Sequence, residues 1–514
     1  MHSIVEAVFH HAQQQPERPA IFFEEQAISY GQLAADVTRF AQALLAWGIQ
    51  PGDRIALFLG NCLPFVVAYL GTQFAGGIVV LINTQYRQVE LHHILTDAGV
   101  RLCVTSAAGR EELLRLAVPT LTTLVIVDEA VGQPSEDTLE SIAFANFVKQ
   151  DDEHDVSLLQ PPLPDAPTII AYTSGTTGQA KGALLYHRNL IANIASITAA
   201  WRWTKNDRLL LVLPLFHAHG LMVGMHGTLF NGASVILRRA FDASDVLGTL
   251  HRDSSISLFF GVPTMYIRLL AEAEQQGILP HPLRLYVSGS APLSPQVFAD
   301  FAHVFGQPIL ERYGMTETLM NLTNPYEGER RAGTVGGPFP GQEARVVDIS
   351  TRQALPPGEI GEIEVRGPHV FAGYWNRSDA TAEAFEPGGW FKTGDLGWYS
   401  HDGYYTITGR ARELIISGGY NIYPREVEDV LATHPAIAEV AVIGIPDPEM
   451  GEQVIAVVVP KEGHTPTTNE IIAFCRERLA SYKKPRRIVF VHELPRNALG
   501  KVQKHLLAAQ LPST

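Results

Sequence analysis

The ten residues that follow a short apolar segment read Thr173-Ser174-Gly175-Thr176-Thr177-Gly178-Gln179-Ala180-Lys181-Gly182. The segment before them, Thr168-Ile169-Ile170-Ala171-Tyr172, has the composition of a buried strand, and Pro167 marks its start. Glycines let a backbone approach a polyanion, hydroxyl and amide groups donate hydrogen bonds to its oxygens, and a lysine supplies positive charge. A strand that leads into such a loop therefore indicates a phosphate-binding site.

Several other motifs of nucleotide binding and catalysis are missing from the sequence. The loop is not a Walker A loop, and Gly500-Lys501 does not complete one because Pro495 stands where the first glycine should be. No G-x-G occurs, so the Rossmann fingerprint is absent. Neither the H-E-x-x-H of zinc proteases nor the G-x-S-x-G of nucleophile elbows is found. The missing motifs argue against a P-loop nucleotidase, a Rossmann dinucleotide-binding enzyme, a zinc protease and a hydrolase with a nucleophile elbow.

The composition is that of a globular protein with an acidic balance. The chain has 514 residues, 46% of them hydrophobic, and a net charge of −14 without a basic footprint, so no nucleic-acid partner is expected. Cys62, Cys103 and Cys475 lie far apart, which favours a reducing compartment. Glycines interrupt the apolar stretch 65–82, so a buried helix and a strand are favoured over a membrane span. We expect a cytoplasmic protein without an integral membrane span, either monomeric or homodimeric.

The apolar pattern divides the chain into two regions. In the first, helical patterns such as the one that opens at Tyr30 alternate with strand-like runs such as 54–59, which predicts a layered α/β domain. The acidic segment 136–155 is predicted to be a surface excursion. In the second region a helix that starts at Pro424, two strand-like runs and another helix predict a compact α+β unit. The predicted divisions are a large domain over 1–409, a hinge over 410–413 and a small domain over 414–514.

Four further segments of distinctive composition stand after the loop. They are Arg312-Tyr313-Gly314-Met315-Thr316-Glu317-Thr318, Thr393-Gly394-Asp395, Gly409-Arg410-Ala411-Arg412-Glu413 and Pro495-Arg496-Asn497-Ala498-Leu499-Gly500-Lys501. Together with the loop, and in this order, they resemble the motifs of the adenylate-forming superfamily, which includes acyl-CoA synthetases, aryl-CoA ligases, luciferases and peptide-synthetase adenylation domains. The resemblance spans nearly the whole chain. It implies a large, layered N-terminal α/β domain that binds ATP and an acid, and a small, mobile α+β C-terminal domain.

The resemblance also implies the residues that hold ATP and Mg²⁺. Tyr313 offers a flat face for adenine, and Asp395 has the geometry to accept both ribose hydroxyls. Glu317 is the implied metal ligand, since magnesium is bound through one or two carboxylates plus substrate phosphates. The implied ATP- or AMP-binding set is Thr173, Ser174, Gly175, Thr176, Thr177, Gly178, Lys181, Ser290, Ala291, Pro292, Glu311, Arg312, Tyr313, Gly314, Met315, Thr316, Asp395 and Arg410.

Lys501 corresponds to the catalytic lysine of the family's small domain. A cation there stabilises the charge that develops when a carboxylate attacks the α-phosphate. The implied catalytic set is Lys501, Thr316, Glu317 and His217. After adenylation the small domain is expected to rotate about the hinge, where Arg412 stands in place of the more usual Lys or Asp. The implied coenzyme A and hinge residues are Arg412, Gly418, Gly419 and Tyr420.

The segments around the implied acid pocket are most similar to malonyl-CoA synthetases. His217 matches the histidine near the acyl carboxylate. Arg284 matches an arginine that is a candidate to bind a distal carboxylate, a task for which a guanidinium offers two parallel hydrogen bonds. Leucine-arginine before Ser-Gly also occurs in fatty acyl-CoA synthetases, where the arginine can be structural. The implied acid-binding set is His217, Arg284, Ser288, Gly289 and Met315.

The resemblance implies an ATP-dependent acid–CoA ligase that forms an acyl-adenylate and then an acyl-CoA thioester, using ATP, Mg²⁺ and coenzyme A. The expected small-molecule acid is malonate or a methylmalonate-like short dicarboxylate. A medium- or long-chain fatty acyl-CoA synthetase is the alternative, and a stand-alone adenylation enzyme that loads a carrier protein is a further one. A binder without catalysis is disfavoured because Lys501, Glu317 and Lys181 are all present.

Overall fold

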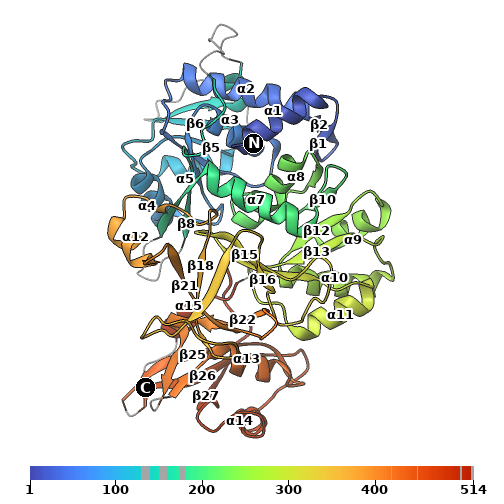
Figure 1. Cartoon of the computed structure of the whole chain (residues 1–514), viewed down its shortest axis with the longest axis vertical. Helices are drawn as coiled ribbons and strands as arrows, with labels where there is room; N and C mark the ends of the chain where they lie inside the picture. The colour runs from blue at the N-terminus through green and yellow to red at the C-terminus, as the bar shows by residue number, and fades with distance from the viewer. Residues whose placement is uncertain are drawn as a thin grey trace.

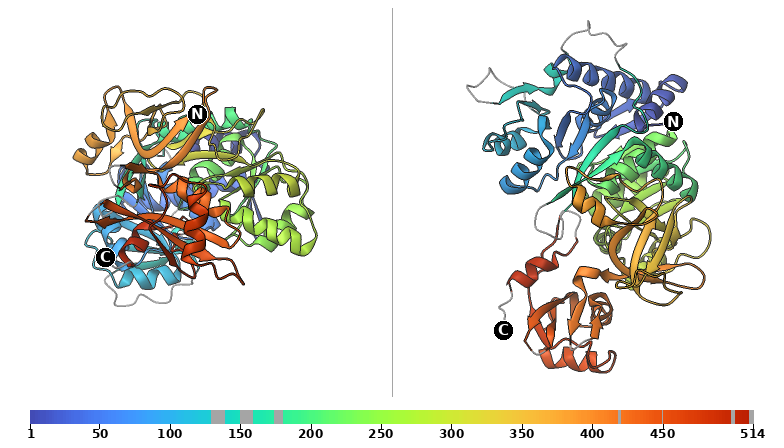
Figure 2. Two further views of the ribbon diagram at one scale, coloured as in Figure 1. Left: turned by 90° about the horizontal axis from the view of Figure 1, so that it is seen from below. Right: turned by 60° about the vertical axis from the view of Figure 1, so that its left-hand side comes forward.

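A computed structural model describes residues 1–128, 139–149, 159–173, 180–417, 420–448, 450–497 and 501–510, with side chains to residue 508. A large body of helices and sheets precedes a smaller body at the C-terminal end (Figures 1 and 2). The predicted mixed α/β architecture, with a large N-terminal and a small C-terminal domain, is confirmed.

The first sheet carries the strand that leads into the phosphate loop. Over the described residues it has eight strands, and the inner strand β4 is apolar throughout because both faces of the sheet are covered. Its order is β19 (Gly373–Tyr374), β9 (Lys181–Tyr186), β8 (Pro167–Thr173), β4 (Ile78–Leu81), β3 (Arg54–Phe58), β5 (Val100–Thr105), β6 (Thr123–Ile126) and β7 (Glu140–Ala143).

The second sheet ends near the same site. Nine strands within the described part of the chain form it, and those from β10 to β14 run parallel. Its order is β16 (Gly337–Pro338), β15 (Leu319–Thr323), β14 (Leu310–Met315), β13 (Leu285–Ser288), β12 (Leu258–Gly261), β10 (Arg208–Leu211), β11 (Ser234–Leu237), β1 (Pro19–Phe23) and β2 (Gln26–Ser29).

Helices pack between the two sheets and on their outer faces. One apolar core joins the facing sides of both sheets through α1 (Ile4–Gln14), α2 (Tyr30–Ala46), α3 (Leu63–Phe74), α6 (Phe144–Phe147), α7 (His187–Trp201), the π-helix η2 (His219–Met225) and α8 (His226–Asn231). The outer face of the first sheet packs on α4 (Gln88–Ala98) and α5 (Ala107–Leu114). The outer face of the second packs on α9 (Ala243–Arg252), α10 (Pro263–Gln276) and α11 (Pro295–Phe305).

A third, antiparallel sheet completes the large body. It contains β17 (Glu343–Val347), β18 (Gly361–Arg366), β21 (Trp390–Tyr399), β20 (Phe385–Glu386) and β22 (Tyr405–Arg410), and α12 (Ser378–Ala384) lies beside it. The predicted hinge segment 410–413 falls between the last strand of this sheet and the first strand of the small body, and it contains the 3-10 turn η3 (Ala411–Glu413).

In its described residues, the small body is an antiparallel sheet with one parallel strand, packed with three helices. The strands are β23 (Ile415–Ser417), β24 (Tyr420–Ile422), β25 (Ile437–Asp447), β26 (Gly451–Pro460) and β27 (Arg487–Phe490). The helices are α13 (Pro424–Ala432), α14 (Thr468–Arg476) and α15 (Lys504–Gln510). It has its own apolar core, built around residues such as Val427, Val442 and Ile471.

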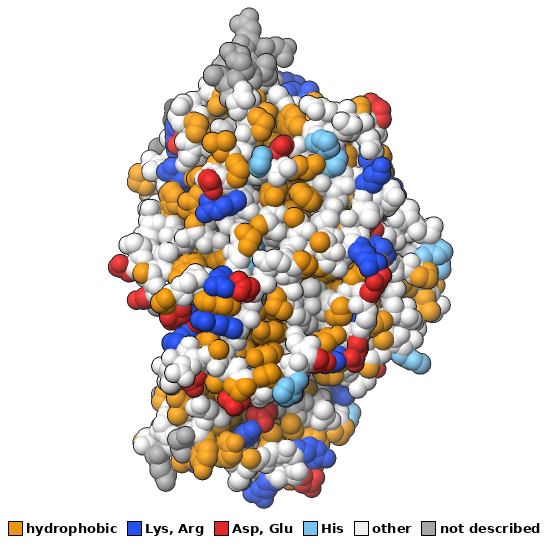
Figure 3. Space-filling model, in the orientation of Figure 1, with side chains coloured by type: hydrophobic (Ala, Val, Ile, Leu, Met, Phe, Trp, Pro, Cys, Tyr) orange, Lys and Arg blue, Asp and Glu red, His pale blue; other side chains and the backbone are white. Residues whose placement is uncertain are grey.

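The surface is of mixed charge. Acidic and basic side chains alternate with apolar ones over the face drawn in Figure 3. Among the described helices, none is long and apolar enough to cross a membrane.

Candidate active site

The candidate site lies where strand ends of the two large sheets approach the third sheet. Tertiary packing joins segments that are far apart in sequence: the Thr173 hydroxyl donates to Glu317 Oε1 over 3.2 Å, and the Tyr313 hydroxyl donates to Asp395. Arg410 Nε lies 2.6 Å from Asp395 Oδ1. The carboxyl ends of parallel strands are the usual ligand-binding edge of an α/β sheet.

The phosphate loop is held at both ends. Thr173 ends β8, Lys181 begins β9, and the two residues pair across the strands. Lys181 Nζ lies 5.4 Å from the centre of the Tyr374 ring, a cation–π contact. The predicted phosphate contacts of the intervening segment fall outside the described residues; they are Ser174, Gly175, Thr176, Thr177 and Gly178.

Glu317 is a buried carboxylate held by hydroxyl groups. Only 6% of the residue is exposed, and its Oε1 accepts hydrogen bonds from Thr173 and, over 3.1 Å, from Tyr374. Burial raises the pKa of the Glu317 carboxyl. The Arg410 charge acts on this carboxylate electrostatically, and among the described residues no cluster of three or more His, Cys, Asp or Glu forms a metal cage. A lone carboxylate of this kind fits a magnesium ion that takes its remaining ligands from phosphates and water.

The nucleotide wall consists of Tyr313, Asp395 and Arg410. Asp395 is 4% exposed and receives both the tyrosine hydroxyl and the guanidinium. Next to it, Gly314 has no room for a side chain, since a Cβ there would lie 2.0 Å from the Leu319 carbonyl oxygen. Predicted adenine-side residues Ser290, Ala291 and Pro292 follow β13, and Ser290 has a φ of 70°.

Lys501, a residue of the small body, lies near the nucleotide wall. The lysine interacts electrostatically with Arg410, Asp395, Glu413 and Arg412. Desolvation, followed by the Arg410 charge, lowers the pKa of the Lys501 ammonium, although much of the side chain is exposed. Two hydrogen bonds join Lys501 to Asn497: the Asn497 amide donates to the Lys501 carbonyl, and the Lys501 amide donates to Asn497 Oδ1, each over 2.9 Å. The structure thus brings the predicted catalytic lysine to the predicted ribose carboxylate.

The acid side of the site contains the half-buried His217 and the buried His219. Burial lowers the pKa of His217 to about 4, so its imidazole is neutral at physiological pH. A small cavity of about 30 Å³ separates it from Thr316 and Ala171. His219, which the sequence did not single out, bonds to the Ser290 hydroxyl over 3.3 Å. Because these imidazoles are neutral, the carboxylate of the acid itself is the charged reactant.

Arg312 is the buried cation of this pocket. It is 3% exposed, and its Nε and Nη2 have no hydrogen-bond partner among the described residues. Its guanidinium packs on Gly289, where a Cβ would lie 2.4 Å from Cζ. Desolvation, together with the charge of Arg312, lowers the pKa of His219. The Ser288 hydroxyl, on the strand residue that pairs with Glu311, is also buried and without a hydrogen bond in the described structure. The surroundings of the Arg312 guanidinium, next to Gly289 and His219, are called the acid recess.

Arg284, the predicted reader of a distal carboxylate, does not lie in this recess. It precedes β13 at the strand's amino end, whereas Ser288 closes the carboxyl end. Its Nε and Nη2 are 2.9 and 3.1 Å from the two carboxylate oxygens of Asp207, and Nη1 donates to the Trp201 carbonyl over 2.7 Å. All three nitrogens are thereby engaged in the scaffold, which favours a structural role for Arg284, and its acid-binding role stays a prediction that these contacts disfavour.

The remaining predicted residues occupy different surroundings. Met315 and Glu311 belong to β14, and Glu311 Oε1 accepts from the Leu293 amide over 2.9 Å. Arg412 lies in η3 within electrostatic reach of Lys501, while Tyr420 is 56% exposed and stacks on Tyr482 with a 4.5 Å centroid separation. Gly418 and Gly419, predicted for the thiol tunnel, lie outside the described residues.

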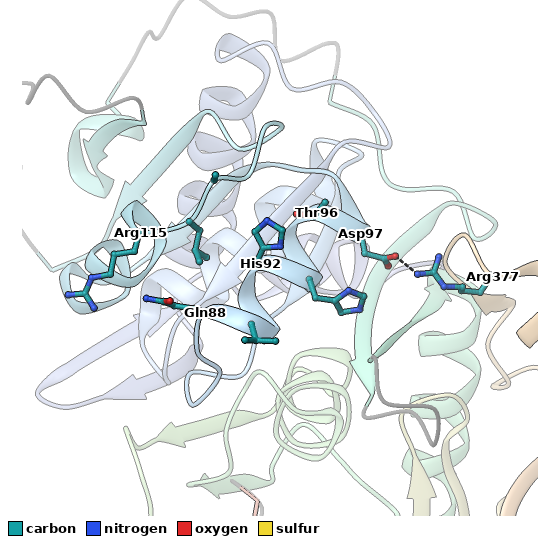
Figure 4. A pocket seen from close by; sticks show the side chains of 10 residues that line it. Gln88, His92, Thr96, Asp97, Arg115 and Arg377 are labelled. Carbon is teal, nitrogen blue, oxygen red and sulfur yellow. Dashed lines mark hydrogen bonds and ion pairs between the residues drawn. The ribbon is translucent and has the colours of Figure 1, made fainter.

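A larger hollow of about 660 Å³ lies beside α4, outside this site (Figure 4). Within it Asp97 is bound by Arg377 over 2.7 Å and by the Tyr172 hydroxyl over 2.7 Å. His93 bonds to the Ala180 carbonyl over 2.8 Å. These contacts tie α4 to both strands that flank the phosphate loop, which makes the hollow's polar groups part of the scaffold.

Two family profiles match the chain. That of the AMP-binding enzyme covers residues 8–375, and that of the AMP-binding enzyme C-terminal domain covers residues 426–501. The solved structure of ATP-bound MatB from Rhodopseudomonas palustris superposes with a TM-score of 0.89 at 37% identity, covering 98% of each chain.

Curated relatives extend over nearly the full chain. A long-chain-fatty-acid–CoA ligase of Bacillus subtilis is 35% identical, covering 96% of this chain and 91% of its own. A sulfoacetate–CoA ligase of Cupriavidus necator is 37% identical, covering 96% and 95%. A malonate–CoA ligase of Arabidopsis thaliana is 32% identical, covering 99% and 88%. With the motifs, the two-domain fold and these matches in agreement, the chain belongs to the AMP-binding enzyme family, the adenylate-forming superfamily.

Proposed function

We propose that the protein is an AMP-forming acid–CoA ligase whose acid carries a second anionic group, with malonate as the expected substrate. Family membership and relatives that act on malonate support the reaction class. The observation that carries the choice of acid is the buried Arg312 guanidinium with two nitrogens unpaired in the described structure. The reaction uses ATP, Mg²⁺ and coenzyme A.

An unpaired buried cation is costly, and a second substrate carboxylate would neutralise it. Nε and Nη2 of one guanidinium lie side by side, which is the arrangement that binds both oxygens of a carboxylate. Arg312 packs against Gly289 and interacts electrostatically with His219, and we assign the distal carboxylate to this guanidinium. The reacting carboxylate then faces Thr316 and His217, toward the nucleotide wall.

A fatty acid fits this environment poorly. A hydrocarbon tail would leave Nε and Nη2 of the buried Arg312 without a hydrogen-bond partner, while its electrostatic interaction with Glu311 remains, and unsatisfied buried donors are costly. Behind the recess, the His219 ring stacks on Phe260 at 6.3 Å, and Trp201 and Trp203 pack edge-on against Phe260 at 5.6 and 5.4 Å. We propose that these buried aromatic rings limit the length of the acid, which favours a short one.

In the first half-reaction a carboxylate oxygen of the acid attacks the α-phosphorus of ATP, and the bond to pyrophosphate breaks. We assign Lys501 and Thr316 to the phosphoryl oxygens, where charge grows in the transition state. Asp395 holds the ribose hydroxyls, and Tyr313 packs on adenine. Glu317 holds Mg²⁺, which supplies charge neutralisation for the phosphates. The neutral His217 orients the acid without protonating it.

In the second half-reaction the thiol sulfur of coenzyme A attacks the acyl carbon. A carbon–sulfur bond forms, the bond to AMP breaks, and the thiol proton is released. We assign the change between halves to rotation of the small domain, 414–514, about Arg412, which removes Lys501 from the nucleotide wall. The exposed Tyr420, beside the two predicted tunnel glycines, would then face the large domain.

A substrate panel tests the proposal. Steady-state kcat/KM values for malonate, methylmalonate, sulfoacetate, oxalate, octanoate and cinnamate would be compared with free coenzyme A. Malonate is expected to lead octanoate by about 100-fold or more, the scale of one buried charge pair. A preference for octanoate or cinnamate would refute the assignment of the acid. Faster transfer to a carrier protein's phosphopantetheine arm than to free coenzyme A would instead support the carrier-loading alternative. We place the reaction in the cytoplasm because the cysteine pattern favours a reducing compartment.

A further inference from the structure

The strand that carries Asp395 is irregular at that residue. In the pairing of β18 with β21, Glu362 lies opposite Leu396 and Glu364 lies opposite Lys392. Ile363 therefore faces three residues, Thr393, Gly394 and Asp395, where regular pairing would place one. Such a bulge bends a strand and redirects its side chains, and bulges are frequent beside active sites.

Three hydrogen bonds fix the shape of this bulge. The Thr393 hydroxyl donates to the Ile363 carbonyl over 2.6 Å and accepts from the Asp395 amide over 3.1 Å. The Gly394 amide donates to Glu362 Oε1 over 3.0 Å. Gly394 has a φ of 68°, in the left-handed region that favours glycine. A carboxylate from the neighbouring strand thus holds the residue next to Asp395.

An ion network holds that carboxylate in turn. Glu362 Oε2 lies 2.5 Å from Arg352 Nη1, and the same guanidinium contacts Glu364, which is fully buried. Arg345 Nη2 lies 2.6 Å from the other oxygen of Glu364. With 7% of Glu362 exposed, water competes little for these bonds. Charge-assisted hydrogen bonds in such surroundings are strong and directional.

We infer that Glu362 is a positioning residue for nucleotide binding: braced by Arg352, it fixes the bulge that aims Asp395 at the ribose hydroxyls of ATP. The inference rests on the proposed ribose role of Asp395 and adds to it a residue that never touches the nucleotide. Its distinctive consequence is selectivity. Loss of Glu362 weakens the contribution of the ribose hydroxyls and leaves contacts to adenine and phosphate in place.

The test is calorimetric binding of MgATP and of its 2′,3′-dideoxy analogue, without acid or coenzyme A. In the parent, ATP is expected to bind more tightly by about 10- to 100-fold, the range for hydrogen bonds to a charged group. In Glu362→Ala this ratio is expected to fall below about threefold through weaker ATP binding, while binding of the analogue changes little. Glu362→Gln, which keeps an oxygen for the Gly394 amide but loses the charge facing Arg352, should give an intermediate ratio.

Glu343→Ala is the matched control. Glu343 pairs with Arg366 over 2.6 Å on the exposed part of the same sheet, so its loss should leave the ratio unchanged. Equal weakening of both nucleotides in the Glu362 variants, or an unchanged ratio, would overturn the inference; if Glu362→Ala does not fold, Glu362→Gln is judged by the same criterion. A parent that binds both nucleotides equally would refute the ribose role of Asp395 itself, and this inference with it.

Discussion

Replacing Arg312 by methionine separates charge from packing in the acid recess. The apolar side chain has similar length, so it still covers Gly289, but the two unpaired donors Nε and Nη2 are gone. A distal carboxylate would lose two hydrogen bonds to a cation, each contributing about 1.5–3 kcal/mol. Because substrate and site relax, we take about 3–4 kcal/mol as the net loss, within the range of about 2–5 kcal/mol for a broken buried pair. This corresponds to a fall of about 150- to 1,000-fold in kcat/KM.

The assay is acid-dependent pyrophosphate release with malonate and with isovalerate, whose isopropyl group has the shape of the second carboxylate. Arg312→Met should lose malonate activity by the stated factor and keep or improve isovalerate activity. Arg284→Met is the control: its guanidinium pairs with Asp207, so a lower melting temperature with an unchanged malonate-to-isovalerate ratio is expected. Equal losses for both acids in Arg312→Met, or a collapse of the ratio in Arg284→Met, would refute the reasoning.

Three further predictions concern the nucleotide side and the folded state. Lys501→Ala should slow acyl-AMP formation by about 100-fold or more, but the variant should still transfer the acyl group from supplied acyl-adenylate to coenzyme A. The two half-reactions are assayed separately, and equal slowing of both would contradict domain rotation. Tyr374→Phe removes one of the two hydroxyl groups that donate to Glu317 and keeps the ring that contacts Lys181. The Mg²⁺ concentration that gives half-maximal ATP binding should therefore shift by a few-fold. An unchanged Mg²⁺ concentration would show that Tyr374 does not support the metal site. Burial lowers the pKa of His187 to about 4 and of His226 to about 3. Between pH 6.5 and pH 4 these histidines therefore take up protons in the unfolded chain but not in the folded one, so acidification over this range should lower the melting temperature steeply. A melting temperature that does not change over this range would argue against neutral buried histidines.

Much of the fold was predictable because its signals are local. The phosphate loop follows β8, Pro167–Thr173, as its apolar run and its proline indicated. Helix α13 begins at Pro424, where a proline costs no internal hydrogen bond. The stretch 65–82 forms α3 and β4, both buried, as its glycines and apolar residues had indicated. In each case a few adjacent residues determine the local structure.

The sequence could not predict which side chains contact one another when they lie far apart along the chain. Arg284 matched a family arginine, but its guanidinium is taken by Asp207, which lies 77 residues earlier in the chain. Arg312 was assigned to the nucleotide with the rest of its motif, because nothing local shows that its nitrogens are buried without partners. Tyr374 was missed for the same reason, since its hydroxyl meets Glu317 57 residues away.

The prediction that the acidic segment 136–155 is a surface excursion was wrong over part of its length. Its described residues include β7, which extends the first sheet beside β6, and α6, whose Phe147 is fully buried against Phe40 and Trp47. The polar composition of the surrounding residues concealed one short edge strand and one buried aromatic ring. Edge strands are short and partly exposed, so their sequence pattern is weak.

The most direct test of the central claim is a competition at equal concentrations of malonate and octanoate, with ATP, Mg²⁺ and limiting coenzyme A, read by mass spectrometry of the thioesters and by AMP release. The account predicts malonyl-CoA as the dominant product, with one AMP formed per thioester. Predominant octanoyl-CoA would contradict a recess built around the Arg312 cation, and thioester formed with ADP in place of AMP would contradict the adenylate-forming reaction itself.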